Sequence, residues 1–147
     1  MSRWETTSTL EADASPAAVW ANAYANAEAW PEWNTEIKRA SLDGPLALRA
    51  KAKIVFGTGL RLHFHVVEFD DGRLFTDEAR LPGARMGHRH LLEPTEHGGS
   101  RLTNTIYVEG SLAPLWRRIL GPAAAKSLPG AQQAIVLLAL SRPPSRG

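Results

Sequence analysis

The sequence contains no cysteine, only two tyrosines and two methionines, and no apolar run long enough to span a membrane. Without cysteine, neither a disulfide framework nor thiol chemistry is open to this chain. The longest apolar run, Ala134 to Leu140, falls far short of the ~20 residues that cross a bilayer, and it indicates a buried helix face. The first residues, MSRWETTSTLEAD, also lack the apolar segment of a secretory signal. These absences predict a cytoplasmic protein without an integral membrane segment.

A large charge excess of one sign is also absent. The 17 basic and 15 acidic residues leave a formal net charge of +2, and Glu78, Glu93 and Glu109 interleave with basic residues on the strand faces expected outside. Because nucleic-acid binding needs basic residues concentrated on one surface, no nucleic-acid partner is expected. The 147 residues are enough for one domain with a sizeable core. We assign the domain to residues 1–141 and a C-terminal tail to residues 142–147.

The pentapeptide WPEWN, Trp30 to Asn34, is the most distinctive local feature that is present. It follows an alanine-rich segment, Ser15 to Ala29, that begins with a helix-start signal: Ser15 as N-cap and Pro16 in the first turn. Pro31 blocks a clean continuation of that helix, and the two indole rings carry too much apolar area for a plain surface loop. We therefore expect a helix end, a turn with a second short helical segment, and two rings that pack into the core.

Alternating apolar and polar residues, punctuated by glycine and proline, predict seven strands. Because short links separate the last six, these six are expected to pair in antiparallel fashion. The final third is helical over Leu112–Leu120 and Leu128–Leu140, and Gly121-Pro122 and Pro129-Gly130 predict a kinked helix or two consecutive ones. The predicted fold is α+β: a curved antiparallel sheet covered by the C-terminal helix, with room for a cavity between them. The expected strands are Arg3–Glu11, Glu36–Leu42, Ala47–Phe56, Gly59–Phe69, Arg73–Leu81, Ala84–Glu93 and Ser100–Gly110.

Period-two alternation places His88 and His90 on the inward face of the strand Ala84–Glu93, because Arg85 and Arg89 occupy the other face. If Pro82-Gly83 is a two-residue hairpin loop, Asp77 lies opposite His88 and Phe75 opposite His90. Asn104 on the neighbouring strand is expected near His90. An Asp–His pair facing an apolar cavity is a candidate general acid/base unit. The alternative interpretation is a mutually satisfied buried pair that only specifies strand register.

Metal and cofactor sites are not expected. The i, i+2 pairs His63/His65 and His88/His90 each supply two ligands, whereas a catalytic zinc ion usually has three from the protein. His63 and His65 share a strand face with Arg61, so they are expected to point to solvent.

Four stretches, ASPAAVW, WPEWN, LPGARMGHR and VEGSLAPLWRRILG, resemble the START-related superfamily of polyketide cyclase/dehydratase and lipid-transport proteins, also called SRPBCC. The similarity covers nearly the whole chain. It implies a helix-grip fold, in which a curved seven-stranded antiparallel sheet wraps around a long C-terminal helix, with two short helices between the first and second strands. It also implies a deep hydrophobic pocket. It does not imply one activity, since members include cyclases and carriers of hydrophobic ligands.

The first functional hypothesis is binding of a small hydrophobic ligand, aromatic, polyketide-like or lipid-like, in the cavity under the C-terminal helix. The alternative is a polyketide cyclase/dehydratase-type enzyme, in which His88 with Asp77 removes a proton and His90 or Asn104 polarises a carbonyl. A third hypothesis is a non-catalytic protein-interaction domain. Under all three hypotheses, the expected oligomeric state is a monomer or a homodimer. The expected ligand-binding residues are Trp20, Trp30, Trp33, Phe56, Phe64, Phe75, Met86, His90, Asn104, Ile106 and Trp116.

Overall fold

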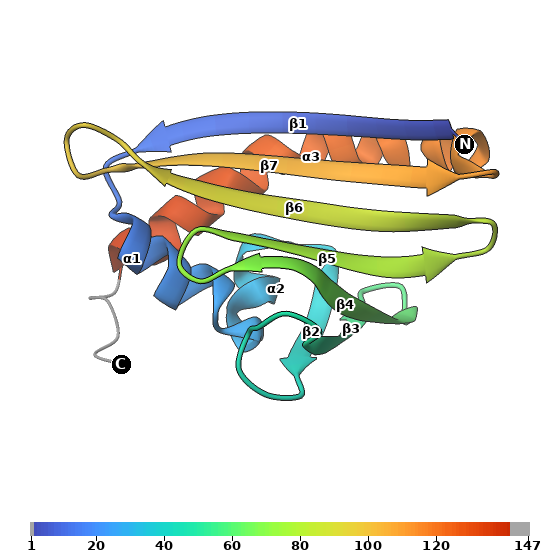
Figure 1. Cartoon of the computed structure of the whole chain (residues 1–147), viewed down its shortest axis with the longest axis horizontal. Coiled ribbons are helices and arrows are strands. Elements are labelled where there is room, and N and C mark those ends of the chain that lie inside the picture. The colour runs from blue at the N-terminus through green and yellow to red at the C-terminus, as the bar shows by residue number, and fades with distance from the viewer. Residues whose placement is uncertain (1, 142–147) are drawn as a thin grey trace.

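The computed structural model describes residues 2–141, which form a seven-stranded antiparallel sheet covered on one face by helices (Figure 1). The predicted α+β arrangement is confirmed, and the strands follow one another in the sheet as β1-β7-β6-β5-β4-β3-β2. The predicted tail, residues 142–147, lies outside the described residues. The strands are β1 (Ser2–Ala12), β2 (Ile37–Leu42), β3 (Lys51–Phe56), β4 (Arg61–Asp70), β5 (Leu74–Leu81), β6 (Ala84–Pro94) and β7 (Ser100–Gly110).

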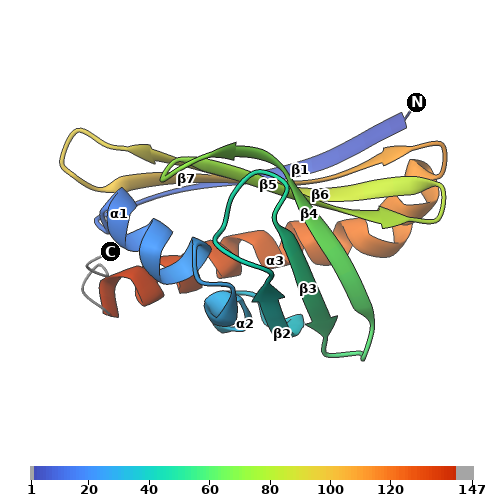
Figure 2. The same ribbon diagram turned by 60° about the horizontal axis from the view of Figure 1, so that its bottom comes forward.

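The C-terminal helix α3 (Ala113–Ser141) is one continuous element of 29 residues. It runs along one face of the sheet, and Figure 2 shows β2 and β3 bending away from the long strands on that same side. Pro122 and Pro129 lie inside α3 and not between two helices. Both are exposed, so the carbonyl that each proline leaves without an intrahelical donor is on the solvent side of the helix. Leu128, Ile135 and Leu138 face the core.

Short helical turns connect β1 to β2, where the alanine-rich segment predicted one helix. They are α1 (Pro16–Val19), a π-helical turn (Trp20–Tyr24), a 3-10 turn (Ala27–Ala29) and α2 (Trp30–Trp33). As predicted, the Ser15 side chain caps the first turn by accepting from the backbone N–H of Ala18 at 3.2 Å.

The WPEWN segment is tied to the helical turn that precedes it. The indole N–H of Trp30 donates to the carbonyl of Tyr24 at 3.0 Å, and that of Trp33 donates to the carbonyl of Ala23 at 3.1 Å. Carbonyls at the end of a helical turn lack an intrahelical partner, so the two indoles satisfy groups that would otherwise be buried unpaired. Both rings are therefore buried, at 2% and 4% exposure.

The predicted register around β5 and β6 is confirmed: Leu81 pairs with Ala84, Asp77 with His88, and Phe75 with His90. Gly83 has a φ of 68°, which suits the third position of a type II turn with proline at the second position. This turn is compatible with the fixed φ of Pro82, which the primed turns typical of two-residue hairpins are not.

Two strand starts differ from the prediction by more than one residue. β3 begins at Lys51 and not at Ala47, because Arg49 has a φ of 70° and interrupts the extended backbone. β4 begins at Arg61 and not at Gly59. Leu48 and Leu60 consequently fall outside the strands and are exposed, at 54% and 55%, although alternation along the predicted strands Ala47–Phe56 and Gly59–Phe69 places them on the apolar, inward face. His63 and His65 are exposed on the outer face, as predicted.

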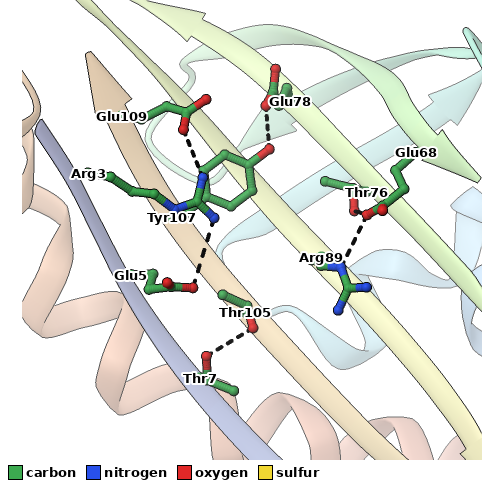
Figure 3. Close-up of polar contacts among 10 residues, drawn as sticks. All are labelled: Arg3, Glu5, Thr7, Glu68, Thr76, Glu78, Arg89, Thr105, Tyr107 and Glu109. Carbon is green, nitrogen blue, oxygen red and sulfur yellow. Dashed lines mark hydrogen bonds and ion pairs between the residues drawn. The ribbon is translucent and has the colours of Figure 1, made fainter. Parts of the chain in front are cut away.

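The outer face of β6 and β7 carries a network around the ring of Tyr107 (Figure 3). The Tyr107 hydroxyl donates to the carboxylate of Glu78. The guanidinium of Arg3 lies 4.2 Å from the ring centroid and also pairs with Glu109 at 2.8 Å. The ring lies over Gly87, where β6 has no side chain to displace it. Gly87 thus provides the space for an aromatic residue on the neighbouring strand.

Replacing Gly87 with alanine is expected to destabilise the fold by about 1–3 kcal/mol, the usual cost of an overpacked site. A Cβ at this position would overlap with the Tyr107 ring, whose hydroxyl and face are held by Glu78 and Arg3. Urea denaturation monitored by tryptophan fluorescence measures the change. Gly44→Ala is the control, because a Cβ there meets no atom within 4 Å. Equal effects of the two substitutions would contradict this explanation.

Candidate functional site

A cavity of about 150 Å³ lies between the inner face of the sheet, α2 and the middle of α3. Its wall combines aromatic rings from α2 and the strands with small and aliphatic side chains from α3. Exposed residues at its edge, Glu36, Ala123 and Ser127, place the mouth between the start of β2 and α3. The wall consists of Trp30, Trp33, Asn34, Glu36, Ile37, Ile54, Phe56, Phe64, Phe75, Asp77, Met86, Gly87, His88, His90, Ile106, Leu120, Ala123, Ala124 and Ser127.

Four rings of the wall form one stack across β6, β5 and α2. The rings of His88 and His90 lie 3.7 Å apart between centroids, and His90 and Phe75 lie 4.1 Å apart at an interplanar angle of 14°. Trp30 continues the stack on Phe75 at 6.2 Å and 13°. Cross-strand pairing of His90 with Phe75 brings the two central rings together. The stack gives the cavity a rigid aromatic wall with imidazole at one end.

Most of the residues predicted from sequence to form the site lie in this wall, and three do not. Trp20 packs behind the wall against Tyr24, Phe69 and Phe75. Trp116 lies near the β5–β6 turn, where its indole N–H donates to the carbonyl of Pro82 at 2.8 Å. Asn104 is buried behind the two histidines. The predicted residues found in the wall are Trp30, Trp33, Phe56, Phe64, Phe75, Asp77, Met86, His88, His90 and Ile106.

Asp77 is a buried carboxyl group without a hydrogen-bonded side-chain partner in the described chain. It pairs with His88 across the strands, yet the nearest imidazole nitrogen to its Oδ1 is Nε2 of His90, at 3.8 Å, which is too long for a hydrogen bond. Oδ1 has no hydrogen-bond partner within the described part of the chain. Burial raises the pKa of Asp77 from 3.8 to about 6, although the nearby His88 and a backbone N–H act in the opposite direction. The Asp77–His88 pair expected from register therefore makes no hydrogen bond, although the two residues do lie opposite each other.

The two histidines interact instead with the side-chain amide of Asn104. Its Nδ2 lies 3.1 Å from Nδ1 of His90 and 3.4 Å from Nε2 of His88. Burial lowers the pKa of His90 from 6.5 to about 3, and burial together with the neighbouring His90 lowers the pKa of His88 well below 6.5. Both rings are therefore neutral at pH 7, when Asp77 is mainly ionised.

Gln132 on α3 connects this polar group to the first and last strands. Its Nε2 lies 2.7 Å from the carbonyl of Ser8, 3.1 Å from that of Leu102, and 3.0 Å from Oδ1 of Asn104. Its Oε1 accepts from the hydroxyl of Ser8 at 2.8 Å. Gln132 is 1% exposed, so the helix carries a fully paired amide in its core-facing stripe.

Sequence patterns did not predict the cavity residues of α3, the residues at the mouth, or Gln132. A signal for Gln132 was present, because it occurs at helical spacing between Leu128 and Ile135, where a core residue is expected. Tyr24 was not predicted either; it is fully buried, with its ring 5.2 Å from that of His90. The hydroxyl of Tyr24 makes no hydrogen bond within 3.5 Å in the described chain, and burial raises its pKa, although the nearby Asn104 side chain acts in the opposite direction.

Neither a metal site nor a membrane span is found within residues 2–141. Three or more histidine, cysteine, aspartate or glutamate side chains placed to hold a metal ion do not occur there. Among the same residues, none of the helices has both the length and the apolar character to cross a membrane.

Comparison with protein families places this cavity in a known context. The sequence model of the family described as polyketide cyclase / dehydrase and lipid transport matches residues 3–142, almost the entire chain. The chain belongs to this family. The superfamily resemblance carried by the four stretches named above is thus confirmed. A search of curated protein sequences gives no match.

Solved structures share the fold of this polyketide cyclase / dehydrase and lipid transport family member at low sequence identity. Norcoclaurine synthase from Thalictrum flavum, in complex with dopamine and hydroxybenzaldehyde, superposes with a TM-score of 0.73 at 15% identity, covering 98% of this chain and 90% of that one. A START superfamily protein from Mycobacterium smegmatis gives a TM-score of 0.68 at 18% identity, covering 90% and 97%. At this level of identity, the similarity establishes the fold alone.

Proposed function

We propose that this protein binds a small aromatic ligand in the cavity between the sheet and α3. The observation that carries the proposal is the stacked wall of Trp30, Phe75 and His90, which faces a cavity that also contains one buried carboxyl group, Asp77. Ligand sites typically combine apolar walls with a few polar groups that orient the ligand. Family membership agrees with a hydrophobic ligand.

The size of the cavity favours one ring over a long chain. Pockets for drug-sized ligands have volumes of roughly 300–1,000 Å³, whereas an apolar protein cavity of about 150 Å³ takes up benzene. The cavity here is also about 150 Å³. A folded polyketide chain or a full acyl chain would extend through the mouth beside Glu36 and Ala123. We therefore propose a ligand whose buried part is a single substituted ring.

Binding of toluene and phenol tests this proposal. Both are expected to bind with dissociation constants on the order of 0.1–1 mM, because burial of one ring contributes a few kcal/mol. Ala124→Leu should remove this binding, since Ala124 lies in the wall on α3 and a larger side chain there occupies the cavity. Ligand-observed NMR or calorimetry measures the affinity.

Ala125→Leu is the matched control, because Ala125 is exposed one position further along the same helix. The control should bind both compounds as the wild type does. The proposal fails if the wild type binds neither compound, or if Ala124→Leu binds both with unchanged affinity while remaining folded by circular dichroism.

A second candidate function is catalysis of the cyclase or dehydratase type that the family description names. The observation in its favour is Asp77, a buried carboxyl in the cavity wall with a pKa of about 6 and an unpaired oxygen. A carboxylate in such an environment is a stronger base than one in water, and its pKa approaches the value that suits a general base at neutral pH. In this candidate, Asp77 and not His88 accepts the proton, and the aromatic wall orients the substrate.

A further inference from the structure

We propose that Gln132 and Asn104 are positioning residues that hold His88 and His90 as neutral hydrogen-bond donors, with their acceptor nitrogens turned away from the ligand. Asp77 then remains the only buried side chain with a free acceptor in the described cavity wall. The ligand half of this inference rests on the proposed function. The tautomer half concerns the protein alone and is tested without any ligand.

The orientation of the Gln132 amide follows from the backbone. Backbone carbonyls are acceptors only, and the carbonyls of Ser8 and Leu102 lie 2.7 and 3.1 Å from Nε2 of Gln132. With the amide turned over, the oxygen of Gln132 would face two carbonyl oxygens in a buried site. The Ser8 hydroxyl, which donates to Oε1 at 2.8 Å, favours the same orientation. Gln132 therefore turns its NH₂ group, and not its oxygen, toward Asn104; the two hydrogens serve three acceptors, so one of them is shared.

The orientation of Asn104 follows from that of Gln132. Nε2 of Gln132 lies 3.0 Å from Oδ1 of Asn104, so the oxygen of the Asn104 amide faces α3. Its Nδ2 consequently faces β6, with two hydrogens available for two histidine rings. An NH₂ group is a donor only, and the ring nitrogen that receives its hydrogen must carry a lone pair.

Each histidine is thereby assigned a tautomer. Nδ1 of His90, 3.1 Å from the Asn104 amide, accepts, so His90 carries its proton on Nε2. Nε2 of His88, 3.4 Å from the same amide, accepts, so His88 carries its proton on Nδ1. The two stacked rings are thus opposite tautomers of each other. The protonated nitrogen of His90, Nε2, is also the one that lies 3.8 Å from Oδ1 of Asp77.

The consequence for a ligand is a cavity with a defined hydrogen-bonding polarity. The lone pairs of both imidazoles are occupied by Asn104, so neither ring can accept a hydrogen from a bound molecule. Asp77 is 6% exposed and its Oδ1 is unpaired. A ring that carries a donor, such as a phenol or an ammonium group, matches this site better than a ring that carries only acceptors.

Nitrogen NMR of protein labelled with ¹⁵N-histidine tests the assignment. Long-range proton–nitrogen correlations at pH 7.5 distinguish Nδ1–H, Nε2–H and doubly protonated rings. The expected result is His88 as Nδ1–H and His90 as Nε2–H, both neutral. His63, His65 and His97 are exposed and provide reference signals in the same spectrum. Finding His88 as Nε2–H, or either ring charged, in the wild type would overturn the proposal.

Asn104→Asp and Gln132→Leu then test the chain of causes. A carboxylate at position 104 only accepts, so His90 should change to the Nδ1–H tautomer and the pKa values of both histidines should rise.

Gln132→Leu should release the Asn104 amide and give mixed tautomers. Gln133→Leu, at an exposed neighbouring position of α3, should leave the spectrum unchanged. If Gln132→Leu folds and retains both wild-type tautomers, Gln132 is not a positioning residue; if Asn104→Asp does not fold, the wild-type spectrum and Gln132→Leu still decide the proposal.

These outcomes do not depend on whether toluene or phenol binds. A protein with the expected tautomers and an empty cavity would refute the proposed function and leave the positioning role of Gln132 and Asn104 intact. Binding of toluene or phenol to a protein with different tautomers would support the proposed function and refute the positioning role of Gln132 and Asn104.

Discussion

Replacing Asp77 with asparagine is expected to stabilise the protein by about 3 kcal/mol at pH 7.5. The pKa of Asp77 is raised from 3.8 to about 6 because its ionised form is buried. A raised pKa means that the folded protein binds this proton more tightly than the unfolded chain does. Ionisation of Asp77 therefore lowers the free energy of unfolding, and this loss is complete above pH 6. It amounts to ~1.36 kcal/mol for each unit of difference between the folded and unfolded pKa values. Asparagine has a similar shape and no charge to bury.

The stabilising effect should depend on pH in a defined direction. As the pH falls below 6, the folded wild type takes up the proton on Asp77, so the advantage of Asp77→Asn should shrink to roughly half at pH 5. Urea denaturation of both proteins at pH 7.5 and pH 5 measures the difference. Asp71→Asn removes a charge from an exposed position and should change stability little at either pH. A loss of stability in Asp77→Asn at pH 7.5 would contradict the assignment of Asp77 as an unpaired buried charge.

The same variant should lose function while it gains stability. If Asp77 accepts a hydrogen bond from the ligand, the wild type should bind phenol more tightly than toluene, and Asp77→Asn should reduce that preference. A group that costs folding free energy and remains in a cavity is typical of functional sites, where a stable core and a reactive pocket make opposite demands. Equal affinities of the variant and the wild type for phenol would remove Asp77 from the site.

The sequence is sufficient to predict the inner face of the sheet, because strand alternation has a fixed period and the β5–β6 loop has a fixed length. Alternation assigns His88, His90, Asp77 and Phe75 to one face, and the Pro82-Gly83 loop specifies their pairing. Local signals at Ser15 and Pro31 likewise predict a helix start and a break. These features depend on neighbours in the chain or across one hairpin.

Strand alternation and local signals do not predict the contacts between α3 and the rest of the site. Periodicity shows that a helix has an apolar stripe, but not which residues of the sheet lie under each turn of it. Leu120, Ala124 and Gln132 enter the site through the position of α3 along the sheet, which no local pattern reports. Trp116, predicted to bind the ligand, lies outside the cavity wall for the same reason, near the β5–β6 turn.

Hydrogen-bond partners within the site are also not predictable from strand pairing. Register places Asp77 opposite His88, yet Nε2 of His90 lies nearest to its Oδ1, and Asn104 occupies the nitrogens that face it. Side-chain rotamers, which the sequence does not reveal, decide which member of a diagonal pair is closer. The structure therefore shows a carboxylate beside two histidines that pair with Asn104, where register alone suggested an Asp77–His88 pair.

Acidification from pH 7 to pH 5 is expected to destabilise the wild type by about 2–3 kcal/mol, as the net effect of its two cavity histidines and Asp77. Burial lowers the pKa of His90 to about 3 and that of His88 well below 6.5. A lowered pKa means that the unfolded chain binds these protons first. The stabilisation is complete above pH 6.5 and is lost as the pH falls toward the folded-state pKa values, at ~1.36 kcal/mol per pH unit for each ring. Protonation of Asp77 in the folded state offsets part of the loss.

His90→Gln isolates this effect, because glutamine keeps an amide able to pair with Asn104 but does not titrate. Its unfolding free energy should be lower than that of the wild type at pH 7.5, since the stacked ring on Phe75 is lost. The slope of its unfolding free energy against pH between 7 and 5 should nevertheless be smaller, because about one proton fewer is taken up on unfolding. Urea midpoints measured at half-unit pH intervals give the slope, and His97→Gln, at an exposed position, should retain the wild-type slope. A His90→Gln slope equal to that of the wild type would mean that His90 is already protonated, or exposed to water, in the folded protein.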